Sequence, residues 1–246
     1  MRFAVISDIH SNVFALQAVL ADAKRQGAQQ FINLGDILYG PIAPQATYDL
    51  LRAHDILTIS GNQDRQTEAA TAADLAANPT LAFIWQDLDE EALIWLRQLP
   101  CDAQVGEAVY ACHGSPGQDT VYLLECIEHG QLQPRTDADI QALLAGVSAS
   151  LVLCGHSHLP RTVQLANGQT IVNPGSVGLP AYRDDEPMAH AVQNFSPHAR
   201  YALIEAGRAG WQVQHHHIAY DYHAAAAAAQ QRQRPDWVKA LLTGRA

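Results

Sequence analysis

An acid and a histidine stand two positions apart at the end of the first apolar segment of the chain. Residues 3–6 read Phe-Ala-Val-Ile, which is typical of a strand, and Asp8 and His10 follow. Residues two apart on an extended chain point to the same side, so these side chains could hold one cation where the strand stops. The alternative is an ordinary strand end followed by a helix that Ser11 or Asn12 caps. This pair alone does not decide between a metal site and a helix start.

Later apolar segments end in the same way. Each is of strand type and stops at metal-binding residue types next to a glycine: Gly35-Asp36 after 30–34, Gly61-Asn62 after 55–59, His113-Gly114 after 105–112, and Gly155-His156-Ser157-His158 after 151–154. The carboxyl ends of strands are where open α/β folds bind their ligands. Packing does not readily explain this repetition, so the pattern favours a metal site.

The candidate ligands combine carboxylate, amide oxygen and imidazole. They are Asp8, His10, Asp36, Asn62, His113, His156 and His158. This mixture suits borderline divalent ions such as Mn²⁺, Fe²⁺, Co²⁺ or Zn²⁺. The set is too large for one tetrahedral ion and suits two ions about 3.5–4 Å apart, bridged by one carboxylate and a water.

In their order along the chain, these motifs resemble those of the calcineurin-like metallophosphoesterases, from residue 1 to about Glu205. Residues 173–178, Asn-Pro-Gly-Ser-Val-Gly, look like a segment of the small bacterial and archaeal phosphodiesterase branch. The resemblance implies that Asp36 bridges two metals. It further implies that the remaining ligands divide into two sets, Asp8, His10 and His158 on one metal and Asn62, His113 and His156 on the other.

The same resemblance implies a fold. We expect an α/β protein built as a four-layer α/β/β/α sandwich, two mixed sheets flanked by helices. The hairpins at 162–172 and 201–218 would then lie in the second sheet. Residues 179–199 contain prolines and many polar residues, and we expect them to be irregular.

The function that the resemblance implies is metal-dependent hydrolysis of phosphoesters. We interpret the chain as a phosphodiesterase that uses a metal-bridging hydroxide, with Asp36 and Asn62 at the reacting centre. Two divalent ions are expected, Mn²⁺ first, with Fe, Zn, Co or Ni as alternatives. The alternatives in function are a phosphomonoesterase or nucleotide pyrophosphatase of the same fold, and a scaffold protein with weak or lost catalysis. Retention of the whole ligand set disfavours the scaffold.

Gln63 is the departure from the family pattern. Many members have a histidine after the asparagine, which donates a proton to the leaving group or stabilises its charge. The small phosphodiesterase branch often lacks this histidine. Glutamine can donate a hydrogen bond but cannot deliver a proton at neutral pH. We therefore count Gln63 among the catalytic residues and expect a preference for esters with good leaving groups. Asp64, next in the chain, is expected to orient a neighbour or cap a helix.

Asn12, Gly175 and Ser176 are our candidates for substrate contacts. Asn12 either reaches a substrate phosphate or caps the helix that follows it. Gly175 and Ser176 either lie against the site or form a tight turn between elements. Arg183, in the segment 179–199, could contact substrate from a lid or form a surface salt bridge.

Composition restricts the remaining possibilities. The chain has 246 residues, a formal net charge of -10 and 48% hydrophobic residues, which suits one domain spanning 1–246 with C-terminal helices from about residue 221. The acidic balance argues against general binding of nucleic acid or membrane surfaces, whereas a small phosphoester substrate held by metal ions fits. The four cysteines form no CxxC pair and no apolar run approaches a membrane span, so we expect reduced thiols and a cytoplasmic protein. A homo-oligomer remains open.

Overall fold

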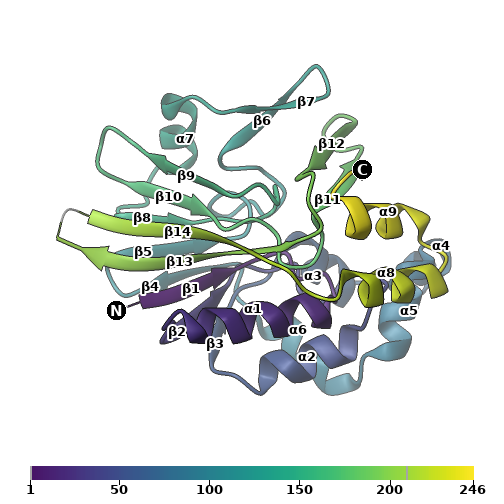
Figure 1. Ribbon diagram of the computed structural model, residues 1–246. Coiled ribbons are helices and arrows are strands. Elements are labelled where there is room, and N and C mark those ends of the chain that lie inside the picture. Colours follow the sequence, from purple (N-terminus) through teal and green to yellow (C-terminus); the bar gives the residue numbers. More distant parts are fainter. Residues whose placement is uncertain (1, 209) are drawn as a thin grey trace.

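Two five-stranded sheets lie face to face in the computed structural model, which describes residues 2–208 and 210–246 (Figure 1). The first sheet has the strand order β14 (Gly210–Ile218), β13 (Ala199–Gly207), β1 (Arg2–Ile6), β2 (Gln30–Asn33), β3 (Ile56–Thr58). The second has the order β4 (Asp102–Val105), β5 (Val109–Cys112), β8 (Leu151–Leu153), β10 (Thr170–Asn173), β9 (Arg161–Gln164). In each sheet three neighbouring strands are parallel, β1 with β2 and β3, and β5 with β8 and β10. The predicted ligands follow these parallel strands.

The side chains of β1 show how the layers are held together. Phe3 and Val5 face the second sheet and join the core between the two sheets. Ala4 and Ile6 alternate with them and face the opposite way, into the core under the helices. Because both faces of this strand are buried, its sequence is a continuous apolar run.

Helices cover the outer face of each sheet. Against the first sheet pack α1 (Val13–Arg25), α2 (Pro44–Arg52), α5 (Pro79–Asp87) and α6 (Glu90–Gln98), with the short α3 (Asn62–Glu68) and α4 (Ala72–Ala77) beside them. Against the second sheet packs α7 (Asp137–Leu143), whose Ile140 contacts the same core as Val152 and Ile171. The predicted four-layer sandwich of two mixed sheets flanked by helices is confirmed.

Two small hairpins and the last two helices lie at one end of the sheets. The hairpins, β6 (Glu125–Glu128) with β7 (Gln131–Pro134) and β11 (Ala181–Asp184) with β12 (His190–Gln193), stand apart from the main sheets. The helices, α8 (Tyr222–Gln231) and α9 (Pro235–Thr243), follow β14 in the chain. Trp237 and Leu241 of α9 share a core with Leu179 and Ala181, so α9 is fixed against the β11–β12 hairpin.

The predicted placement of the hairpin at 201–218 is wrong. Its strands β13 and β14 belong to the first sheet, because β13 pairs antiparallel with β1, with Arg2 opposite Glu205. The hairpin at 162–172 does lie in the second sheet, as predicted.

Two further segments differ from expectation. Residues 179–199 contain the regular β11–β12 pair, in which Tyr182 lies opposite Val192. Residues 105–112 are not one strand, because the chain reverses at Gly106, which has a φ of 61°, and β4 and β5 run antiparallel on either side of this turn.

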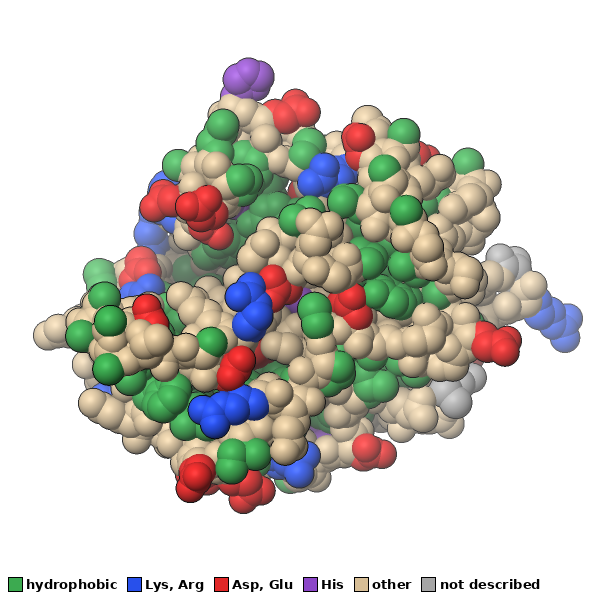
Figure 2. Space-filling view, turned by 180° about the vertical axis from the view of Figure 1, so that it is seen from behind, with side chains coloured by type: hydrophobic (Ala, Val, Ile, Leu, Met, Phe, Trp, Pro, Cys, Tyr) green, Lys and Arg blue, Asp and Glu red, His purple; other side chains and the backbone are tan. Residues whose placement is uncertain are grey.

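Charged side chains of both signs are distributed over the surface of the protein. In the space-filling view, acidic and basic side chains are interspersed with hydrophobic ones over the face shown (Figure 2). Within residues 2–208 and 210–246, no helix has both the length and the apolar character needed to cross a membrane.

Candidate metal centre

The predicted ligands gather into two buried groups at the carboxyl ends of the parallel strands. One group is Asp8, His10 and His158, and the other is Asp36, His113 and His156. Within each group the ligand atoms lie within 4.8 Å of one another, and every member is at most 8% exposed. Asn62, the remaining predicted ligand, adjoins the second group, since its Oδ1 lies 3.0 Å from Nε2 of His113. Residues far apart in the sequence thus form one compact polar cluster.

The backbone at most of these residues is strained. A left-handed φ is found at Asp8 (54°), His10 (50°), Asp36 (53°), His156 (65°) and His158 (57°). Residues other than glycine adopt this region at a cost, and such strain is concentrated at functional sites. Backbone hydrogen bonds between loops hold the conformation, for example from Asp8 N to Gly35 O (3.0 Å) and from His10 N to Asp36 O (3.0 Å). The first two ligand loops therefore fix each other.

In the first group, the two imidazoles present their Nε2 atoms to one another. Nδ1 of His10 lies 3.1 Å from the Tyr39 carbonyl oxygen, and Nδ1 of His158 lies 2.6 Å from the Leu179 carbonyl oxygen. A carbonyl oxygen can only accept, so each Nδ1 carries a proton and Nε2 is the atom that faces the site. The two Nε2 atoms are only 3.1 Å apart. Two ring nitrogens at this distance are satisfied by a proton on one of them or by a metal ion bound to both.

The Asp8 carboxylate lies beside these two rings, and in the described part of the chain its buried charge has no hydrogen-bond donor to stabilise it. It is fully buried, and neither oxygen has a hydrogen-bond partner among the described residues. Nε2 of His158 lies 3.2 Å from Oδ1 of Asp8. A buried carboxylate without hydrogen bonds is costly unless a cation compensates it. The residues of this group therefore fit a divalent ion, which aspartate and histidine both bind.

The second group is arranged similarly. Nδ1 of His113 contacts the Leu34 carbonyl oxygen at 2.7 Å, which directs Nε2 toward the ligand cluster. Besides Oδ1 of Asn62, Oδ2 of Asp36 lies 3.5 Å from this Nε2. Two oxygens thus converge on one ring nitrogen, an arrangement that a proton on His113 or a metal ion at the same place can satisfy.

Burial and charge set the protonation of the ligands. Burial, assisted by His158, lowers the pKa of His10 to about 4, and burial, assisted by His113, lowers the pKa of His156 to about 4. These two rings are therefore neutral at pH 7 and ready to bind a metal. Burial acts in the same direction on His113, but the Asp36 carboxylate outweighs it and raises the pKa of His113 to about 10. In the metal-free protein His113 is thus a cation paired with Asp36.

Metal binding at the second group is expected to release a proton and to strengthen as the pH rises. The pKa of His113 is about 10, so its ring must lose a proton before Nε2 can bind a metal. The apparent affinity should increase about tenfold for each pH unit between pH 6.5 and 8.5. Calorimetric titration with Mn²⁺, in two buffers of different ionisation enthalpy, measures both effects. Affinity that is independent of pH, without proton release, would contradict this account.

Asp64 joins the two loops that carry Asp36 of the second group and the adjoining Asn62. Its Oδ1 accepts a hydrogen bond from Ile37 N (2.9 Å) and its Oδ2 accepts one from Gly61 N (3.0 Å), which joins the loop after β2 to the start of α3. Burial and the nearby Asp36 charge raise the pKa of Asp64 to about 7. The prediction that Asp64 caps a helix and orients a neighbour is confirmed by these contacts.

The three residues proposed to contact substrate lie beneath the ligands. Asn12 caps α1 through the Ala15 amide (3.1 Å), and its Nδ2 donates to the Gly178 carbonyl (2.9 Å). Ser176 Oγ donates to the Asp8 carbonyl (2.8 Å). Gly175 has a φ of 80°, as a tight turn requires. All three residues are buried and none is among those that line the cavity above the ligands, and their contact with substrate stays a prediction.

A cavity of about 490 Å³ opens above the ligands. At its metal end it is lined by His10, Asp36, Asn62, Gln63, His156 and His158. Gln63 is also tied to the ligands through its backbone, since its amide donates to Oδ1 of Asp36 (2.9 Å). The opposite wall comes from the β11–β12 hairpin and α9, including Tyr182 and Trp237, which the sequence interpretation did not assign to the site.

Comparison with known proteins agrees with this geometry. A family model of the calcineurin-like phosphoesterase superfamily domain matches residues 1–194. The chain belongs to this superfamily. The resemblance inferred from the motifs is thereby confirmed, and with its two buried donor groups the chain is a metal-dependent phosphoesterase.

Two relatives show how far the similarity extends. Over 197 residues the chain is 29% identical to the protein MJ0912 of Methanocaldococcus jannaschii, covering 72% of this chain and 76% of that protein. The crystal structure of a metallophosphoesterase from Sphaerobacter thermophilus has the same fold, with a TM-score of 0.76, 24% identity and 98% coverage of both chains. The phosphoesterase fold therefore spans nearly the whole chain, including the helices beyond residue 194.

Proposed function

We propose that this phosphoesterase is a phosphodiesterase with a dinuclear metal centre. The observation that carries the proposal is the pair of buried donor groups, each with one aspartate and two histidines, at the floor of one cavity. Asp8, His10 and His158 would hold one ion, and His113, His156 and Asn62 the other, with Asp36 as the shared carboxylate. When bound, two divalent ions of this kind supply an acidified water and neutralise the charge on phosphoryl oxygens.

The chain's own residues orient the substrate. Oδ1 of Asn62 faces His113. The Nδ2 group of Asn62 can therefore donate a hydrogen bond to a phosphoryl oxygen. Gln63 lines the cavity beside Asn62, and its side-chain amide can donate a hydrogen bond to the leaving oxygen but no proton. Burial of the ligands under these groups keeps bulk water away from the reacting centre.

One feature supports a diester over a monoester. The cavity of about 490 Å³ continues past the ligands to α9, which leaves room for a second organic group beyond the phosphate. Gln63 cannot protonate a poor leaving group, so we expect good leaving groups in either class of ester. Mn²⁺ is the ion we propose first for the mixed carboxylate and imidazole donors.

The proposal is tested by hydrolysis of bis(p-nitrophenyl) phosphate and p-nitrophenyl phosphate side by side. The protein is stripped with a chelator and then assayed with Mn²⁺, Zn²⁺, Co²⁺ or Ni²⁺ restored. We expect activity only with metal, and a higher kcat/KM for the diester. A higher kcat/KM for the monoester would overturn the phosphodiesterase assignment. Metal binding without hydrolysis of either ester would overturn the assignment of the protein as an enzyme.

Replacing Gln63 with histidine should raise turnover most on esters with poor leaving groups. An imidazole at this position can deliver a proton to the departing oxygen, an effect of about 10²-fold or more when geometry is favourable. We therefore expect a larger gain for phenyl esters than for p-nitrophenyl esters in Gln63→His. Gln63→Ala is the matched control, because it removes the side-chain amide without adding an acid. An equal effect of Gln63→His on both leaving groups would refute the assigned role.

A further inference from the structure

The loop that carries His156 and His158 is held by residues in and next to the β11–β12 hairpin. Both histidines have a left-handed φ, 65° and 57°. The Tyr182 hydroxyl donates to the His156 carbonyl (3.1 Å), and Nδ2 of Asn194 donates to the His158 carbonyl (3.0 Å). The carbonyl of Leu179, just before the hairpin, accepts from Nδ1 of His158 (2.6 Å). The hairpin therefore stabilises a strained loop that gives one ligand to each donor group.

Tyr182 contacts a ligand of each donor group. Its hydroxyl holds the backbone of His156, which belongs to the second group. Its ring lies against the His158 imidazole of the first group, with centroids 4.6 Å apart. A shift of this one side chain would therefore displace ligands of both groups.

A chain of buried polar contacts fixes the position of Tyr182 itself. Its Oη lies 2.7 Å from Oη of Tyr122, which lies 2.9 Å from Nε2 of His190. Nδ1 of His190 donates to the Met188 carbonyl (2.8 Å) in the turn of the hairpin. The Tyr122 ring also packs on the His156 imidazole, with centroids 4.6 Å apart. Tyr122 and His190 are each 6% exposed, and a buried polar network of this kind holds its members rigidly.

We propose that Tyr182 is a positioning residue for metal binding, which holds the His156 backbone with its hydroxyl and the His158 ring with its aromatic face. The inference rests on the proposed function for the presence of an ion at each donor group. Residues that orient metal ligands without binding the metal contribute about 10–100-fold to metal affinity. The two contacts of Tyr182 can be removed one at a time, because phenylalanine keeps the ring without the hydroxyl and leucine keeps neither.

Titration of the chelator-stripped protein with Co²⁺, followed by the visible absorption of the bound ion, tests the proposal. Tyr182→Phe removes the hydrogen bond to His156 and should weaken the binding of one of the two ions about tenfold, with a changed absorption spectrum. Tyr182→Leu also removes the ring from His158 and should weaken the binding of both ions. Retention of the tighter ion in Tyr182→Phe but not in Tyr182→Leu is the expected signature of the two contacts.

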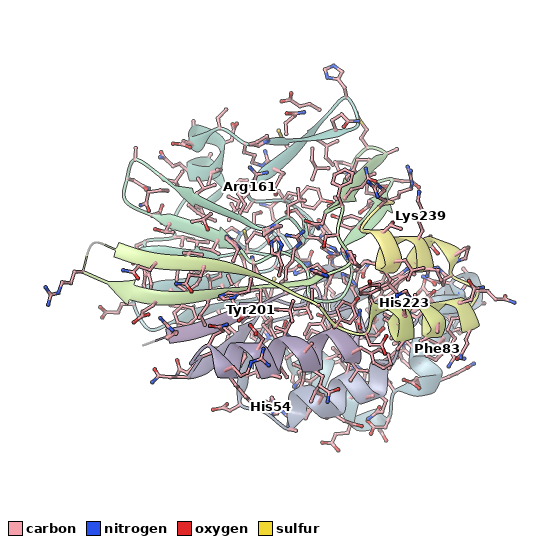
Figure 3. The ribbon with its side chains drawn as sticks, viewed as in Figure 1. His54, Phe83, Arg161, Tyr201, His223 and Lys239 are labelled. Atoms are coloured by element: carbon pink, nitrogen blue, oxygen red, sulfur yellow. The ribbon has the colours of Figure 1, made fainter. Side chains whose placement is uncertain are left out.

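Tyr201→Phe is the matched control. Tyr201 is buried, and its hydroxyl donates to Oδ2 of Asp22 (2.7 Å). Figure 3 shows Tyr201 on β13, away from the β11–β12 hairpin. This variant should lower the unfolding temperature as Tyr182→Phe does, because each loses one buried hydrogen bond, but should leave Co²⁺ affinity and spectrum unchanged. Wild-type Co²⁺ binding in Tyr182→Phe, or an equal loss in Tyr182→Phe and Tyr201→Phe, would overturn the positioning role.

Assays of ester hydrolysis on the same proteins separate this inference from the proposed function. If Tyr182→Phe binds Co²⁺ more weakly than the wild type but neither protein hydrolyses an ester, the phosphodiesterase assignment fails and the positioning role stands. If both proteins hydrolyse the diester preferentially and bind Co²⁺ equally, the positioning role is overturned and the phosphodiesterase assignment stands.

Discussion

Replacement of Asp36 by asparagine is expected to abolish metal-dependent hydrolysis while leaving the fold intact. The carboxylate is buried, lies 3.5 Å from Nε2 of His113 and accepts the Gln63 amide, so it belongs to the ligand group and to the cavity wall at once. An amide has the same shape but no charge with which to hold a divalent ion. Loss of about 4 kcal/mol of transition-state stabilisation would lower kcat/KM by about a thousandfold. Metal content after gel filtration and kcat/KM on bis(p-nitrophenyl) phosphate measure the two effects.

The controls for this variant follow from the surroundings of Asp36. Asp119→Asn removes a carboxylate of the same kind, paired with Arg65 at the protein surface, and should keep both metal and activity. Thermal unfolding should show that Asp36→Asn is folded, because the loss of the pair with His113 is offset in part by the relief of repulsion between Asp36 and Asp64. A variant that keeps wild-type metal content and activity would exclude Asp36 from the centre.

The gathering of the candidate ligands at one edge could be predicted from the sequence because its signals are local. Five of the parallel strands are apolar runs that are followed by candidate ligands, in four of the five cases with a glycine beside one of them, as at Gly35-Asp36 and Gly155-His156. The carboxyl ends of parallel strands meet at one edge, so local pattern and sheet geometry together bring the side chains into one place. Two buried groups at that edge are what the structure contains.

The backbone strain at the ligands could not be predicted, because its cause is not local. Nothing next to Asp8 or His10 in the sequence requires a positive φ. Hydrogen bonds from these residues to Gly35 and Asp36, on the neighbouring loop, hold it. A conformation that depends on partners about 27 residues away can be recognised only in the folded chain.

The sheet assignment of 201–218 failed for a different reason. Strand periodicity identifies a strand but not the partner with which it pairs. A signal was nevertheless present in the sequence: residues 201–204 read Tyr-Ala-Leu-Ile, a continuous apolar run, whereas apolar and polar residues alternate at 211–214 of β14. A run buried on both faces belongs in the interior of a sheet, beside β1, and the alternating strand belongs at its edge. The cavity wall from α9 had a weaker signal, the helical spacing of Trp237, Ala240 and Leu241, which predicts a buried face but not its position.

Replacement of Gly178 by alanine is expected to destabilise the protein strongly and to weaken metal binding with it. A Cβ at this position would overlap the carbonyl oxygen of Ile9, a backbone atom that cannot turn aside. Gly178 also donates its amide to the Asp8 carbonyl (3.0 Å), so any shift that relieves the overlap moves a metal ligand.

We expect a loss of about 3 kcal/mol or more in the free energy of unfolding for Gly178→Ala, measured by urea denaturation. Gly117→Ala is the matched control, since its Cβ would meet open space and only its φ of 68° is unfavourable, a cost of about 1 kcal/mol. If Gly178→Ala is too unstable to purify, Asn12→Ala is a milder variant that tests the same contact. Its unfolding at different Mn²⁺ concentrations is compared with that of the Gly117→Ala control. Asn12→Ala removes the Nδ2 hydrogen bond to the Gly178 carbonyl and should lower stability by about 1–2 kcal/mol. Equal stabilities of Gly178→Ala and Gly117→Ala would refute the close packing of the glycine loop on the first ligand loop. That packing fixes the turn that carries Asp8, because the loop after β10 lies directly on it and its Gly178 amide donates to the Asp8 carbonyl.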